Sequence, residues 1–140
     1  MKQRLLGIAM LMLRFSLAAS FLAAVTDRFG LWGPPGTPAV SWGDLAHYNA
    51  YVAVLNWFLP TAIIPLVGWA ATLAESLLAV GLLIGWQLRW FALGSALLLL
   101  SFVTTMLVAL GPKAPLEYSV FTTMSAAFLL FVLQSKPERV

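Results

Sequence analysis

Four long apolar runs dominate the sequence and limit what the chain can fold into. They cover residues 5–25, 61–86, 90–110 and 118–134. A helix rises about 1.5 Å per residue, so about 20 residues cross the roughly 30 Å hydrocarbon core of a bilayer. The first three runs reach that length, and the fourth is shorter. The pattern predicts an all-α membrane protein, a four-transmembrane-helix bundle that forms a single domain over residues 1–140.

The composition agrees with this class and removes several kinds of function. Apolar residues make up 61% of the chain and charged residues 9%, against about 25% charged residues in soluble domains. Cysteine is absent, which excludes disulfides, thiolate metal sites and a cysteine nucleophile. With His47 as the single histidine, we expect no metal site. No set of nucleophile, base and orienting group can be assembled, so an independent catalyst is not expected.

The basic residues predict the orientation in the membrane. Five of them flank the runs on one side, namely Lys2, Arg4, Arg89, Lys136 and Arg139, while Arg28 and Lys113 remain for the other side. Cytoplasmic loops carry the excess of lysine and arginine, so both termini are predicted to be cytoplasmic. Because these residues are scattered singly, the net charge of +3 does not indicate nucleic acid binding. The first run is expected to be a retained span and not a cleaved signal peptide, because Arg14 interrupts it.

The first outer loop contains a second kind of helix. Ser41 and Asp44 form an S-x-x-D capping pattern. After them, apolar residues recur every three or four positions, at Leu45, Tyr48, Val52, Leu55 and Leu59. This spacing predicts an amphipathic helix over residues 42–59, lying on the outer surface or between the spans. His47 is interpreted as a surface residue of that helix and not as a metal ligand.

Two charges inside the apolar runs are the strongest candidates for a functional site. Arg14 lies about 14 Å from the cytoplasmic edge of the first run, and Glu75 lies about 16 Å from the cytoplasmic end of the second. A lone charge at the bilayer centre costs at least about 2.5–3.5 kcal/mol. We therefore predict that Arg14 and Glu75 pair inside the bundle. The pair is either a structural lock between helices or a polar site that binds a ligand headgroup or relays a proton.

A second group of polar residues is predicted at the outer ends of the runs. It comprises Asp27, Arg28, Lys113 and Glu117, with Tyr118 beside them. The charged residues are expected to form a salt-bridged rim, which is the common outcome for exposed charges. The alternative is the mouth of a cavity, with Tyr118 as a hydrogen-bonding group.

Three segments resemble the DoxX family of small membrane proteins. Residues 73–85 read L-A-E-S-L-L-A-V-G-L-L-I-G and resemble its A-E-x-x-x-G-x-x-L-x-x-G stretch, with the first glycine shifted to Gly81. Residues 113–121 read K-A-P-L-E-Y-S-V-F and resemble the segment before the last span, with Glu117 where many members have aspartate. Arg14 followed by Asp27-Arg28-Phe29 is similar to the first-span pattern, with Arg28 in place of a common lysine.

The resemblance implies a four-helix protein of a bacterial-type inner membrane that partners redox enzymes, such as thiosulfate:quinone oxidoreductase. Since the chain lacks cysteine, a role in electron transfer requires it to host a quinone or to anchor a redox-enzyme partner that carries the cofactor. The first hypothesis is therefore a quinone-site or anchor subunit, with Arg14, Glu75 and Tyr118 as the ligand-binding or proton-relay residues. The second is a structural scaffold, and the third is a protein that binds a small solute or lipid.

Overall fold

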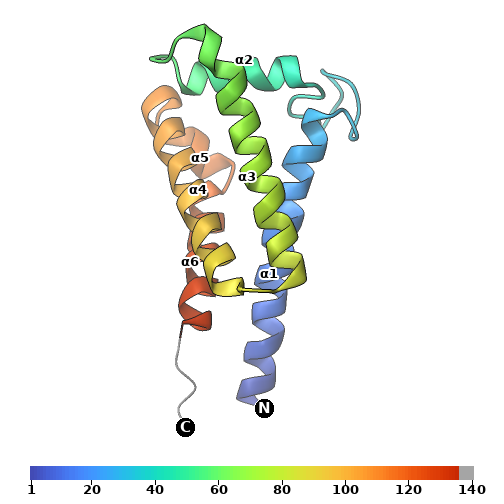
Figure 1. Ribbon diagram of the computed structural model, residues 1–140, viewed down its shortest axis with the longest axis vertical. Coiled ribbons are helices and arrows are strands. Elements are labelled where there is room, and N and C mark those ends of the chain that lie inside the picture. Colours follow the sequence, from blue (N-terminus) through green and yellow to red (C-terminus); the bar gives the residue numbers. More distant parts are fainter. Residues whose placement is uncertain (136–140) are drawn as a thin grey trace.

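All regular secondary structure is helical over residues 1–135, which are the residues that the computed structural model describes. Four helices run lengthwise, and α2 lies across one end of them (Figure 1). The long helices are α1 (Lys2–Arg28), α3 (Ile64–Ile84), α4 (Leu88–Leu110) and α6 (Val120–Gln134). The shorter ones are α2 (Leu45–Leu55), the 3-10 turn η1 (Thr61–Ile63) and α5 (Lys113–Glu117).

Three of these segments are long and apolar enough to cross a membrane: Lys2–Arg28, Thr61–Ile84 and Leu88–Leu110. The fourth apolar run is helical too, but α6 has 15 residues, which is below the roughly 20 that a span needs. Helices are thus confirmed in all four apolar runs, and three carry the length of a span. That the fourth run also crosses the membrane stays a prediction.

The helix of the outer loop is shorter than predicted, at residues 45–55 and not 42–59. Asp44 is its N-cap and accepts a hydrogen bond from the backbone N–H of His47 at 2.7 Å. The capping role expected for Ser41 is therefore wrong, because Asp44 itself satisfies the first turn. At the other end, the Asn56 side chain donates to the carbonyl of Val52 at 2.9 Å, and the helix stops there.

Buried apolar side chains hold the lengthwise helices together. The main cluster contains Leu17, Ala18, Phe21, Ala79, Leu82, Ala92, Ala96, Leu99, Ala127 and Leu130, from α1, α3, α4 and α6. Many large apolar side chains instead face outward, such as Leu66, Leu77 and Val108, each more than 60% exposed. Outward apolar faces on this scale suit lipid and not water.

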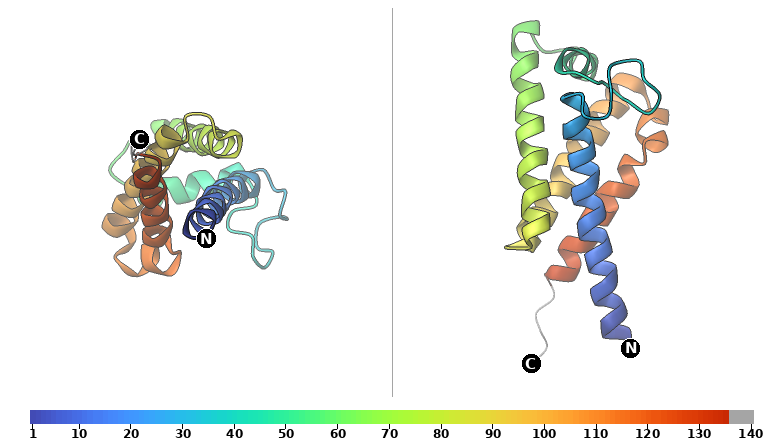
Figure 2. Two further views of the ribbon diagram at one scale, coloured as in Figure 1. Left: turned by 90° about the horizontal axis from the view of Figure 1, so that it is seen from below. Right: turned by 90° about the vertical axis from the view of Figure 1, so that its right-hand side faces the viewer.

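Helix α1 extends beyond the end of α3 (Figures 1 and 2). The guanidinium of Arg14 donates to the carbonyls of Leu82 and Leu83, in the last turn of α3. Residues 2–13 therefore continue past α3 by about 18 Å at helical rise. This offset sets which residues of α1 and α3 meet, and it decides the composition of the polar site described below.

Gly81 permits the close approach of α3 and α4. A Cβ atom at this position would lie 2.1 Å from the ring of Phe91 on α4, far inside van der Waals contact. The small residue is therefore needed for packing, as the G-x-x-x-G spacing with Gly85 suggests. Gly85 has a different role, since it ends α3 in the left-handed conformation with a φ of 78°.

We expect Gly81→Ala to destabilise the protein by about 1–3 kcal/mol, because the Phe91 ring has to move out of its packed position. The matched control is Gly7→Ala on α1, where nothing lies within 4 Å of an added Cβ. That variant should keep or slightly raise stability, since alanine favours helix. Unfolding in detergent measures both changes, and equal effects at the two sites would contradict the packing account.

Candidate functional site

A buried ion pair between Arg28 and Glu75 forms the polar centre of the protein. The Arg28 Nη2 atom lies 2.5 Å from Oε2 of Glu75, and the two side chains are only 2% and 4% exposed. Arg28 is the last residue of α1, whereas Glu75 lies in the middle of α3. The pair therefore joins the outer end of one helix to the interior of another. Each charge supplies the partner that the other needs in a low-dielectric interior.

Neighbouring groups enclose the Arg28 guanidinium on several sides. Its Nη1 donates to the hydroxyl of Thr72 at 2.8 Å, and that hydroxyl donates to the carbonyl of Gly68. The Tyr48 ring covers the guanidinium, with its centroid 3.9 Å from Cζ, and the Trp42 ring lies at 5.4 Å. Cation–π contact of this kind stabilises a desolvated arginine. Helix α2 and the loop before it thus cover the ion pair with aromatic rings.

The predicted pairing of Arg14 with Glu75 is wrong. Arg14 lies at the last turn of α3, where it donates to the carbonyls of Leu82 and Leu83. Those residues are seven and eight positions after Glu75, or about 10–12 Å along the helix. The prediction placed Arg14 and Glu75 at similar depths because it assumed that α1 and α3 end at the same level on the cytoplasmic side. In the structure, α1 extends past the end of α3. Arg14 satisfies helix-terminal carbonyls, a favourable place for a cation.

Asp27 fixes the loop that precedes α2. Its Oδ2 accepts hydrogen bonds from the backbone N–H groups of Ser41 at 2.8 Å and Trp42 at 3.2 Å, and its Oδ1 accepts one from Gly43 at 3.2 Å. The residue is only 6% exposed. These three hydrogen bonds tie the backbone of residues 41–43 to the end of α1. Asp27 therefore holds Trp42 in place over Arg28.

The predicted outer rim of Asp27, Arg28, Lys113 and Glu117 does not form. Asp27 and Arg28 are buried and have the partners described above. Lys113 and Glu117 pair with each other at 3.8 Å on α5, one helical turn apart, with side chains 85% and 63% exposed. The charged side chains of α5 are exposed. Asp27 and Arg28 therefore belong to the buried polar centre, while Lys113 and Glu117 form a separate surface pair.

His47 is an exposed residue of α2, as predicted. Its Nδ1 lies 2.8 Å from Oδ1 of Asp44, and both side chains are largely exposed. The hydrogen bond from the His47 backbone is the main cause that lowers the pKa of Asp44. Within residues 1–135, no three histidine, aspartate or glutamate side chains gather in a way that could hold a metal ion.

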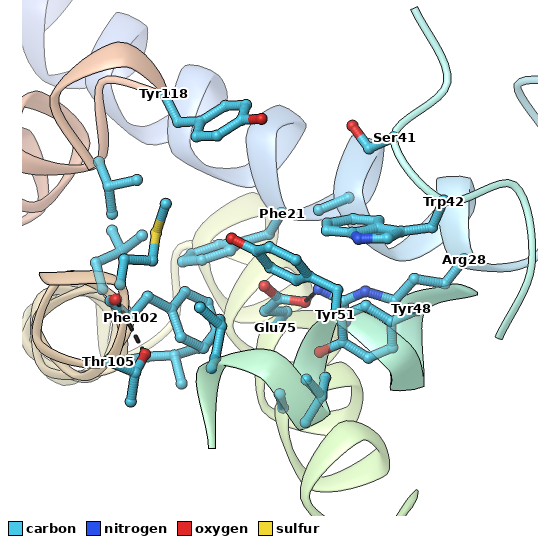
Figure 3. A pocket seen from close by; sticks show the side chains of 18 of the residues that line it. Phe21, Arg28, Ser41, Trp42, Tyr48, Tyr51, Glu75, Phe102, Thr105 and Tyr118 are labelled. Atoms are coloured by element: carbon cyan, nitrogen blue, oxygen red, sulfur yellow. Dashed lines mark hydrogen bonds and ion pairs between the residues drawn. The ribbon is translucent and has the colours of Figure 1, made fainter. Parts of the chain in front are cut away.

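A cavity of about 970 Å³ lies beside the ion pair, between the lengthwise helices and α2. Glu75 and Arg28 line one part of it, together with the hydroxyl-bearing Tyr48, Tyr51 and Ser41. Apolar side chains line most of the rest, among them Phe21, Val67, Leu98, Leu99, Phe102 and Met106. The volume is at the upper end of the range for small-molecule sites, roughly 300–1,000 Å³. Figure 3 shows Glu75 and Tyr51 turned toward this space.

Two tyrosines of α2 supply neutral hydrogen-bonding groups to the cavity. Burial is the main cause that raises the pKa of Tyr48 and that of Tyr51. Both phenols therefore remain protonated at neutral pH and can donate a hydrogen bond. Tyr118 also lines the cavity, but its side chain is 70% exposed. It lies at the border of the space (Figure 3), which agrees with the alternative of a cavity mouth and not with the expected rim.

Two atoms of the ion pair lack a hydrogen bond among the described residues. They are Nε of Arg28 and Oε2 of Glu75, both of which are buried. Oε2 of Glu75 is nevertheless in direct ion-pair contact with the Arg28 guanidinium. Buried polar atoms are normally satisfied. Both atoms are enclosed by the ion pair and by the rings over Arg28.

Sequence reasoning missed Trp42, Tyr48 and Tyr51 as site residues. It placed Trp42 at the start of the predicted amphipathic helix and Tyr48 on the apolar face of that helix. The available signal was their spacing, since Tyr48 and Tyr51 lie three residues apart and share one face of α2. No family model, curated protein or solved structure matches this chain.

We expect Asp27→Asn to loosen the loop over Arg28, because the amide keeps the shape but loses the charge that three N–H groups contact. The expected cost is about 1–3 kcal/mol. Hydrogen exchange at the amides of Ser41, Trp42 and Gly43 should accelerate about tenfold or more.

The control for this variant is Asp44→Asn at the start of α2. Asparagine is as good an N-cap as aspartate, and the site is exposed, so exchange at the three loop amides should not change. Equal acceleration in both variants, or none in Asp27→Asn, would show that Asp27 does not hold the loop.

Proposed function

We propose that this protein binds a quinone in the cavity beside Arg28 and Glu75, as the quinone-site or anchor subunit of a membrane redox system. The observation that carries the proposal is a mainly apolar cavity, inside a bundle of apolar helices, with hydrogen-bonding groups gathered at one end. A quinone has the same division, with two carbonyl oxygens on a ring and a hydrocarbon chain. When bound, it supplies two-electron, two-proton redox chemistry.

The residues at the polar end fit a quinone headgroup. The Tyr51 phenol, which lines the cavity, is a hydrogen-bond donor suited to a carbonyl oxygen. Phe21, Trp42 and Phe102 supply apolar and aromatic surface for a flat ring. Glu75, which is held by Arg28, is the proposed proton carrier at its carboxylate. Tyr118 is proposed to stand at the mouth of the site, while Arg14 is assigned to the end of α3.

The proposed topology has four spans with both termini in the cytoplasm of a bacterial-type inner membrane. The starts of α1 and α4 lie at the end of the bundle opposite α2 (Figure 1), and they carry Lys2, Arg4 and Arg89. Arg28 is the last residue of α1, and Lys113 is the first residue of α5, which follows the other end of α4. The positive-inside rule then puts α2 outside. Lys136 and Arg139, which also entered that prediction, lie outside the described residues. The fourth span is proposed for α6, whose 15 residues would sit with little tilt.

Three short resemblances to the DoxX family point in the same direction as the cavity. They support a membrane partner of a redox enzyme, which would bring the electrons that this cysteine-free chain does not carry. The alternative, a structural scaffold, is supported by the Arg28–Glu75 ion pair, because a contact that joins α1 to α3 explains both buried charges without a ligand.

Titration of the purified protein with a quinone that bears a ten-carbon chain tests the binding proposal, with tryptophan fluorescence as the signal. Ala71→Phe fills the cavity from α3 and should weaken binding at least tenfold. Tyr51→Phe removes one donor and should weaken it by about three- to tenfold. Ala19→Phe is the matched control on an exposed face of α1 that does not line the cavity, and it should bind like the parent. Binding that survives Ala71→Phe unchanged would contradict the proposal.

Glu75→Gln separates the quinone site from the scaffold. In the proposed function, the variant changes quinone binding or the activity of the co-purified complex beyond its effect on stability. A scaffold predicts that only the thermal unfolding temperature falls and that native membranes yield no quinone with the protein. Extraction of the protein from native membranes, with quinone analysis and mass spectrometry of partners, measures both outcomes.

A further inference from the structure

A second, smaller hollow runs between α1 and α6. It has a volume of about 170 Å³ and is lined by Leu13, Ser16, Leu17, Ser20, Ser119, Thr122, Thr123 and Ala126. Two of these residues, Ser20 and Thr123, also line the large cavity. The smaller hollow, which we name the α1–α6 groove, therefore meets the cavity at these two side chains. From Ser20 to Leu13 it follows α1 for seven residues, or about 10 Å.

The side chains of the groove do not close it. Small residues between membrane helices usually allow the backbones to approach closely, but here they border an open hollow. The Ser20 hydroxyl donates to the carbonyl of Ser16 at 2.9 Å, and the Thr123 hydroxyl donates to that of Ser119 at 3.0 Å. Both hydroxyls are thus satisfied within their own helices. The surface that they leave toward the groove is small and weakly polar, which suits a hydrocarbon chain.

The ends of the cavity and the groove differ in chemistry. The cavity holds the Arg28–Glu75 pair and Tyr51 at its polar end, next to α2. The groove begins about eight residues earlier on α1, at Ser20, and runs away from that polar end toward Leu13. Ser16 and Ser20 are both exposed, so the groove is accessible along this stretch of α1.

We infer that the α1–α6 groove is the tail subsite of the cavity's ligand, so that a long-chain amphiphile enters sideways from the bilayer with its headgroup at Arg28 and Glu75. This inference rests on the proposed function, because it takes a quinone as the ligand of the cavity. It adds that the chain of the ligand contributes to binding and leaves the protein between α1 and α6. A ligand with the same headgroup and no chain occupies the cavity alone.

A series of quinones with one headgroup and side chains of one to ten carbons tests the inference in the full-length protein. For the parent, the affinity should rise at least tenfold from the shortest to the longest chain. Ser16→Trp obstructs the groove from α1, and Ala126→Phe obstructs it from α6; neither residue lines the cavity. In both variants, the affinity should no longer rise with the length of the quinone side chain. The affinity for the shortest quinone should stay within about twofold of the parent value.

The control is Ala19→Trp, which adds the same bulk on an exposed part of α1 that lines neither hollow. It should retain the full dependence on chain length. Retained binding of the shortest quinone shows that each groove variant is folded. Because the two substitutions lie on opposite walls of the groove, one variant still tests the inference if the other does not fold.

The outcomes separate the inference from the proposed function. If the parent binds quinones but the groove variants keep the gain with chain length, the tail subsite is wrong and the quinone site stands. If the parent binds no quinone of the series, both are overturned. Analysis of the lipids that co-purify with the protein distinguishes a quinone tail from a phospholipid. If both groove variants lose a phospholipid that the parent and Ala19→Trp retain, the groove binds lipid, and the inference of a quinone tail is contradicted.

Discussion

The buried contact between Arg28 and Glu75 is the interaction on which the rest of the structure depends. Glu75 lies in the middle of an apolar helix, where a carboxylate without a partner would be strongly unfavourable. Its partner comes from the last residue of α1, so the outer end of that helix has to stay beside the centre of α3. The ion pair thereby fixes how far α1 is shifted along α3.

That shift has consequences at both ends of the bundle. At the outer end, the Arg28 guanidinium requires cover from lipid and water, and Tyr48 and Trp42 provide it. The backbone bonds to Asp27 hold the loop that carries Trp42. At the other end, Arg14 meets the last carbonyls of α3. Three charged residues of α1 therefore have three separate tasks: Asp27 holds the loop, Arg28 holds Glu75, and Arg14 completes the end of α3.

The cavity follows from the way α2 covers the bundle. Because α2 lies across the ends of the lengthwise helices (Figure 1), Tyr48 and Tyr51 line the space between them. This places phenols beside the ion pair at one end and leaves alkyl and aromatic side chains elsewhere. The division into a polar end and an apolar remainder is the basis for the proposed amphiphilic ligand.

Local patterns predicted the helices well, because hydropathy and capping act over a few residues. The helices in the apolar runs and the exposed position of His47 both depend on neighbouring sequence alone. The pairing of Arg14 with Glu75 could not be derived in the same way. It required the relative shift of two helices, which was estimated from an assumed common membrane surface, and the extension of α1 past α3 invalidates that estimate.

The cavity lining lay beyond sequence reasoning for a related reason. Tyr48 has the spacing of an apolar-face residue, and Trp42 lies at the predicted start of the same helix. Both interpretations are locally reasonable. Only the placement of α2 across the bundle brings these rings over Arg28. Spacing along one helix identifies a face, but it does not identify what that face will cover.

A double-mutant cycle on the free energy of unfolding tests the central ion pair most directly. We predict that Arg28→Met and Glu75→Leu each cost about 3–5 kcal/mol, and that their combination costs less than the sum by about 1–3 kcal/mol. Arg14→Met combined with Glu75→Leu should be additive within about 0.5 kcal/mol, because these side chains do not meet. Coupling of Glu75 to Arg14, with additivity between Glu75 and Arg28, would contradict the account.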